Sequence, residues 1–186
     1  MTAGRIAAAL TARFDDEALR PPALAPAADV ERWAGQPAWA ALARLCAPQG
    51  GPPLAVATLA GPEALACGEA FAAVLDGSQR LAALGRAAGL AWRLQVKLRD
   101  ALPWRGLQPG DPWDSGWART APASLRHLPI GFAPRRATLV LADVADRPAL
   151  TLALATFVQK AEGWRHPLRW LWLDGRDEGA LRVLPG

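Results

Sequence analysis

Three short apolar runs constrain the fold of this chain more than any other feature of its sequence. They span Leu54–Ala60, Ala137–Ala142 and Leu168–Leu173, and Arg169 is the one charged residue in them. Apolar runs of this length are typical of strands that are buried on both faces of a parallel sheet. Segments with helical periodicity separate the runs, so the sequence predicts an α/β fold with crossover helices. A chain of 186 residues has room for one domain of this kind.

Helical patterns fill much of the remaining chain. Ile6, Leu10 and Phe14 are four residues apart, which predicts a helix over the first 20 residues that ends at Pro21. Apolar spacing also predicts helices within residues 29–45, 69–75, 78–88 and 149–162. We therefore divide the chain into an N-terminal helix with a proline- and alanine-rich linker, residues 1–28, and one α/β domain, residues 29–186.

Two segments depart from this pattern. Trp92–Arg99 alternates apolar and polar residues, which predicts a strand with one exposed face near an edge of the sheet. Residues 100–134 are rich in proline and glycine, and connections of this length usually carry function. The segment contains Trp104, Trp113 and Trp117, which we interpret either as core packing or as a surface for a partner.

The segment after the first apolar run has the position of a phosphate-binding loop but few of its residues. A P-loop reads GxxxxGK[ST] between a strand and a helix: backbone amides surround the phosphates, the lysine neutralises them and the hydroxyl binds magnesium. Here the chain reads GPEALACG from Gly61 to Gly68. Only the first glycine is kept, because Ala66, Cys67 and Gly68 stand where the second glycine, the lysine and the hydroxyl residue are expected.

With these residues the chain resembles the nucleotide-binding core of the STAND and AAA-type P-loop ATPases, in a diverged bacterial form, over roughly residues 30–176. RRATLVLAD resembles the Walker B strand, with Asp143 as its magnesium-side carboxylate, and LRWLWLDGR, which contains Asp174, resembles the sensor strand. The resemblance implies a three-layer sandwich around a mostly parallel sheet of about four strands, in the order 2-3-4-1. It also implies that a fifth strand and a helical lid are missing, because few residues follow the sensor strand.

The altered residues argue against hydrolysis. Cys67 offers no cation and Gly68 no oxygen, whereas phosphoryl transfer depends on charge neutralisation by lysine and magnesium. Glu63 adds a negative charge inside the loop, where it would repel phosphate. Val144 stands where related ATPases usually have the glutamate that polarises water. We therefore expect vestigial nucleotide-binding positions, no catalysis and no cofactor.

The function that follows is a non-catalytic domain that acts as a protein-interaction or regulatory module. Its partner would be another protein or a second copy, bound at the tryptophan segment or at an open sheet edge. One alternative is an atypical NTPase that binds ATP or GTP with magnesium and uses an arginine such as Arg99 or Arg176 in place of the lysine. A second alternative is a nucleic-acid adaptor, since the net charge is +4, although acidic residues interrupt the basic ones throughout.

Other residues give weaker signals. Cys67 at a helix start could be a reactive thiol with His127 or His166 as its base, but a small structural residue is the favoured interpretation. Aspartates could gather around a cation, yet capping roles are commoner, so no metal is expected; they are Asp111, Asp114 and Asp143. Two cysteines, no secretion signal and no apolar run of ~20 residues predict a cytoplasmic protein without a membrane partner.

Overall fold

The computed structural model describes residues 19–47, 51–100, 108, 110–121, 132, 134, 136–176 and 179–186. In this part of the chain, six strands form one mixed sheet in the order β1-β3-β4-β5-β2-β6. The strands are β1 (Leu19–Arg20), β2 (Leu54–Ala60), β3 (Asp114–Ala118), β4 (Thr138–Asp143), β5 (Leu168–Asp174) and β6 (Arg182–Pro185). The α/β class predicted from the sequence is therefore confirmed.

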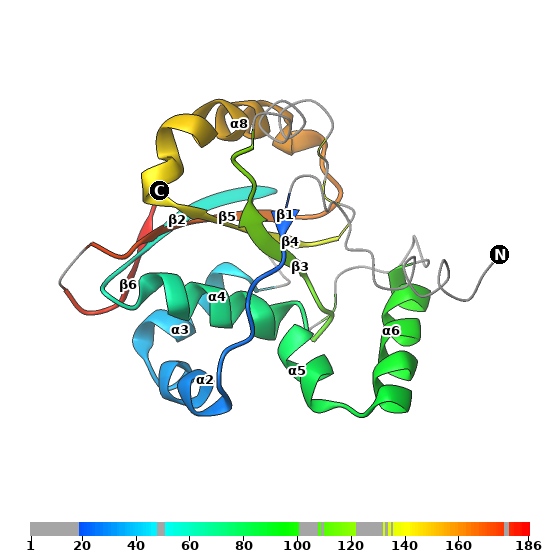
Figure 1. The fold of residues 1–186 in the computed structure, drawn as a ribbon. Coiled ribbons are helices and arrows are strands. Elements are labelled where there is room, and N and C mark those ends of the chain that lie inside the picture. Colours follow the sequence, from blue (N-terminus) through cyan, green and yellow to red (C-terminus); the bar gives the residue numbers. More distant parts are fainter. Residues whose placement is uncertain are drawn as a thin grey trace.

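Helices cover both faces of this sheet (Figure 1). One face carries α8 (Arg147–Lys160), and the other carries α2 (Ala27–Ala34), α3 (Pro37–Leu45) and α4 (Ala64–Leu75). Beyond α4, the chain continues through α5 (Ser78–Ala83) into α6 (Arg86–Asp100), which stands at the periphery of the molecule. Two short 3-10 turns, η1 (Val144–Asp146) and η2 (Ala161–Gly163), flank α8.

The centre of the sheet is parallel and its edges are antiparallel. β3, β4, β5 and β2 run parallel to one another, and when these four are numbered in chain order their order across the sheet is 2-3-4-1. β1 and β6 pair antiparallel with β3 and β2. The expectation of about four mostly parallel strands thus describes the centre, while the described sheet has six strands and is mixed. The expected absence of a fifth strand is wrong, because β6 pairs with β2 at the edge of the sheet.

Alternate residues of the central strands form two cores. Leu171 and Leu173 of β5 pack on the α2–α4 side, together with Leu139 and Leu141 of β4. Trp170 and Trp172 face α8, and the Trp170 ring lies 5.9 Å from that of Phe157. Successive strand residues point to opposite faces, so strands covered on both sides are apolar at nearly every position, with Arg169 of β5 as the buried charged exception. The three strands predicted from the apolar runs are confirmed as β2, β4 and β5.

The predicted strand over Trp92–Arg99 is wrong, since these residues belong to α6. Their alternation fits a strand, but Leu90, Leu94 and Leu98 are also four residues apart, and leucine, glutamine, lysine and arginine are good helix formers. α4 begins at Ala64, five residues before the helix predicted from residue 69. The helix predicted over 78–88 is split by Leu84 and Gly85 into α5 and α6.

Other predictions fall partly or wholly outside the described residues. The first 18 residues and Trp104 lie there, as does His127. Leu19 and Arg20, predicted as the end of a helix, form β1 instead. Within the described residues, no helix combines the length and the hydropathy that a membrane span requires.

Candidate functional site

The carboxyl ends of the parallel strands are where ligands bind in open α/β sheets. Ala60 of β2 pairs with Asp174 of β5, and Asp143 of β4 pairs with Leu173. Gly61 follows Ala60 directly. Three of the residues singled out in the sequence, Gly61, Asp143 and Asp174, therefore lie along one edge of the sheet. This edge is the candidate site.

The connection between β2 and α4 is shorter than the sequence pattern suggested. β2 ends at Ala60 and α4 begins at Ala64, which leaves only Gly61, Pro62 and Glu63 between them. The Ala64 amide donates to the Gly61 carbonyl oxygen at 3.0 Å, and the Cys67 amide donates to that of Glu63 at 2.8 Å. Ala66, Cys67 and Gly68 are consequently inside the helix. A phosphate cradle needs a longer loop whose amides converge on the anion.

The backbone of Gly61 is held by neighbouring strands. Its amide donates to the carbonyl oxygen of Asp174 at 3.0 Å. Its φ of 138° is unfavourable for other residues, and an added Cβ would lie 3.2 Å from the backbone of Leu181. The fold therefore requires glycine at this position because Gly61 pairs with β5 and lies against Leu181, the residue before β6. Phosphate binding is not needed to explain this glycine.

The positions that correspond to the lysine and the hydroxyl residue are buried. Cys67 is fully buried in the core, and burial, with a smaller effect of the Glu63 carboxylate, raises the pKa of its thiol to about 12. A Cβ added at Gly68 would lie 2.6 Å from Cδ2 of Leu173. Cys67 is therefore a neutral packing residue at physiological pH, and neither side chain position opens towards the edge of the sheet.

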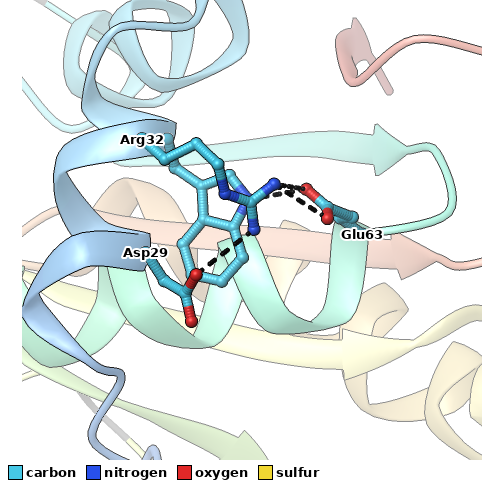
Figure 2. A network of polar contacts seen from close by, with 4 residues as sticks. Asp29, Arg32 and Glu63 are labelled. Carbon is cyan, nitrogen blue, oxygen red and sulfur yellow. Dashed lines mark hydrogen bonds and ion pairs between the residues drawn. The ribbon is translucent and has the colours of Figure 1, made fainter.

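Glu63 forms the polar centre of the site (Figure 2). Arg32 of α2 donates from Nη1 to Oε1 of Glu63 at 2.9 Å and to Oε2 at 2.7 Å. The Trp33 indole donates from Nε1 to Oε2 at 2.9 Å, and the Arg32 guanidinium lies 4.9 Å from the Trp33 ring centre. Asp29 approaches Arg32 from the other side, at 3.5 Å. Arg32 of α2 thus places a cation beside the start of α4.

These contacts make Glu63 a stable anion. The hydrogen bond from Trp33, followed by that from Arg32, lowers the pKa of the Glu63 carboxyl group. The hydrogen bond between Arg32 and Glu63 also raises the pKa of Arg32. A carboxylate at the N-terminal end of a helix is favoured by the helix dipole. The charge that sequence reasoning treated only as repulsive to phosphate is therefore compensated within the chain.

The two aspartates cap the turns that follow their strands. Oδ1 of Asp143 accepts from the Ala145 amide at 2.8 Å, and Oδ1 of Asp174 accepts from the Arg176 amide at 3.1 Å. Val144 begins η1 after Asp143. Among the described residues, no three histidine, cysteine or acidic side chains gather so that they could hold a metal ion.

The tryptophans of the irregular segment are partly core residues. Trp113 is only 3% exposed and belongs to the core on the α4 side, so it does not offer its ring to a partner. Trp117 is half-buried on β3, where its Nε1 donates to Oε1 of Glu69 at 2.8 Å and its ring lies 5.7 Å from the Arg20 guanidinium carbon. Both residues hold the fold together.

Sequence reasoning missed Arg32 and Trp33 as members of the site. Arg32 is 31 residues from Glu63 in the sequence, and the contact depends on how α2 packs against α4. The signal present in the sequence was a carboxylate just ahead of a helix, together with an Arg-Trp pair in α2, the second helix before it.

We compared the chain with protein-family models, with curated proteins and with solved structures, and none of the three comparisons gives a match.

Proposed function

We propose that this chain is a non-catalytic domain of P-loop NTPase type that acts as a protein-interaction or regulatory module. The observation that carries the proposal is the closed connection between β2 and α4. Three residues span it, and one of them, Glu63, supplies an anion that Arg32 already neutralises. A nucleotide phosphate would compete with this internal carboxylate for the same cation.

The chemistry of the neighbouring positions supports the absence of catalysis. Phosphoryl transfer relies on positioned cations around the transferring group. Cys67 supplies a buried neutral thiol, and Gly68 packs against Leu173. Asp143, the candidate magnesium-side carboxylate, accepts a hydrogen bond from the backbone of its own turn. No group in this arrangement would hold or activate a triphosphate.

The arrangement of the sheet supports the NTPase-like ancestry. The parallel strands lie in the order β3-β4-β5-β2, and the degenerate loop, Asp143 and Asp174 meet at one edge. Cys46 and Cys67 are free thiols, which suits a reducing cytoplasm. Because the short connection between β2 and α4 leaves no room for a phosphate at the carboxyl end of the parallel strands, the domain would act through its surface on another protein.

Isothermal titration calorimetry of the purified chain with ATP, GTP and their magnesium complexes tests the proposal. We expect no binding in the micromolar range by the wild type. The Glu63→Gln variant is the informative comparison, because it frees Arg32 from its carboxylate while leaving the short connection in place. Micromolar binding by the wild type would overturn the proposal and favour the atypical NTPase. Salt-dependent gel shifts with single-stranded and duplex DNA test the nucleic-acid alternative.

A further inference from the structure

The two edges of the sheet are poorly suited to a partner strand. Within the described residues, β1 comprises only Leu19 and Arg20. In β6, the Gly186 amide donates to Val56 of β2, so by the alternation of an antiparallel pair Val183 and Pro185 turn their backbone groups outward. Proline has no amide hydrogen, and a proline on an edge strand blocks further pairing. A helical surface is therefore the better candidate for contact with another protein.

The outward face of α6 exposes three leucines in a row. Leu90, Leu94 and Leu98 are four residues apart and are 56%, 50% and 61% exposed. The opposite side of the helix faces the body of the molecule: an added Cβ at Gly77 would lie 2.5 Å from the Trp92 ring, and one at Gly89 would lie 3.2 Å from Leu81. α6 thus uses one face for its own fold and turns the leucines away.

The spacing on this outward face is that of a helix-pairing seam. Ala87, Ala91, Leu94 and Leu98 follow one another at intervals of four, three and four residues, the a and d positions of a heptad. Both alanines are exposed, and small side chains beside leucines permit the close approach of a second helix. Large exposed apolar side chains in such an array mark interaction sites.

The charge of α6 indicates the chemistry of the partner. Among the side chains of α6 that the structure describes, three are basic and none is acidic; the basic ones are Arg86, Arg93 and Lys97. We propose that α6 pairs with an acidic amphipathic helix of another protein, along the seam of Ala87, Ala91, Leu94 and Leu98, with Leu90 beside it at position g. This inference rests on the proposed function, for which it names the docking surface and the chemistry of the partner.

Two other occupants fit the same face less well. A second copy would bring an equally basic α6 against this one, and like charges across an interface are unfavourable. An interfacial helix on an anionic membrane commonly turns a tryptophan or phenylalanine to the lipid. The one aromatic residue of α6, Trp92, instead packs against Gly77 on the body side.

The test uses the full chain and a synthetic amphipathic helix of about three heptads. The acidic probe has leucine at positions a and d and glutamate at positions e and g, while a matched probe has lysine in place of glutamate. The variant replaces Leu90, Leu94 and Leu98 by glutamine, which keeps helix propensity. The control variant, Leu152→Gln with Val158→Gln, alters two exposed apolar residues of α8, 72% and 59% exposed.

We expect the acidic probe to bind the wild type and the α8 control in a salt-dependent manner, measured by fluorescence anisotropy. The α6 variant should bind at least about tenfold more weakly. The inference is overturned if the acidic probe does not bind, if the lysine probe binds equally well, or if the α6 variant keeps full affinity. It is also overturned if the wild type instead sediments with phosphatidylglycerol vesicles, or forms dimers that the α6 variant loses.

The two proposals fail independently. Nucleotide binding by the wild type would refute the proposed function while leaving the probe measurement to stand. Loss of probe binding with no nucleotide binding would refute only the role of α6.

Discussion

The guanidinium of Arg32 donates two hydrogen bonds to the carboxylate of Glu63 and so ties α2 to the start of α4. Replacing the carboxylate by Glu63→Gln removes the charge that holds this contact. Both side chains are partly exposed to water, which screens the pair, so we expect a small fall in Tm rather than unfolding. Asp29→Asn, which weakens the 3.5 Å contact to Arg32 and removes an acidic charge from the first turn of α2, should lower Tm less.

The same pair predicts a pH dependence. The pKa of Glu63 is lowered in the folded state, so its contribution to stability is present above the unfolded value of about 4.3 and is lost as the pH falls through the folded value. The difference in Tm between the wild type and Glu63→Gln should therefore shrink on acidification below that value. A difference that is constant down to the most acidic folded condition would contradict this assignment.

Introducing a hydroxyl at Gly68, where a P-loop would have serine or threonine, should destabilise the fold. In Gly68→Thr the new side chain would meet Leu173, whose Cδ2 lies 2.6 Å from the position of an added Cβ, and its hydroxyl would be buried. We expect a loss of about 2–4 kcal/mol in the free energy of unfolding, measured in urea, and no gain of magnesium-nucleotide binding. Gly163→Thr is the control, because no atom lies within 4 Å of its added Cβ. If both variants lose the same stability, overpacking at Gly68 is not the cause.

Both cysteines should be unreactive in the native protein. Burial raises the pKa of Cys46 to about 12, against a smaller opposite effect of Arg169, and it raises that of Cys67 to about 12. Near pH 8 the thiolate that attacks a disulfide reagent is therefore scarce in the folded state. We expect negligible labelling by Ellman's reagent until guanidinium chloride exposes both thiols. The raised pKa values also affect stability. Because the unfolded thiols ionise at a lower pH than the folded ones, the free energy of unfolding should fall as the pH rises from about 9 towards 12. Rapid native labelling of either cysteine would refute this account.

The core under α8 should depend strongly on Phe157. This side chain is fully buried, and its ring centre lies 5.4 Å from that of Trp164 and 5.9 Å from that of Trp170. Phe157→Ala should lower the free energy of unfolding by about 3–5 kcal/mol. Tryptophan fluorescence during chemical unfolding measures this loss. Leu152→Ala, on the exposed side of the same helix, should change stability by no more than about 0.5 kcal/mol. Equal losses for the two variants would mean that α8 does not pack as described.

The central strands were predictable because their signal is local. Strands that are covered on both faces need apolar residues at successive positions, and six of the seven residues of Leu54–Ala60 are apolar, the exception being the small polar Thr58. The inner strand β3 and the edge strand β6 carry no such signal. β3 reads DSGWA, and β6 contains only four residues with a terminal proline, so their strand conformation depends on pairing with β4 and β2.

The candidate site was predictable in place but not in shape. Gly61, Asp143 and Asp174 lie at or directly after the ends of predicted parallel strands, and such residues must meet at one end of the sheet. The register of the loop was not predictable, since a helix that starts at Ala64 draws Ala66, Cys67 and Gly68 into its first two turns. Alanine and leucine favour the helix over a loop at these positions.

The hydrogen bond between the Gly61 amide and the Asp174 carbonyl makes the turn after β2 an extension of the sheet ladder. Point substitutions at Ala66, Cys67 and Gly68 would therefore change side chains without freeing the main chain around them. Anion capture by this turn would require extra residues between Ala60 and Ala64, so that the turn could detach from its neighbouring strand. An insertion, and no single replacement, would supply them.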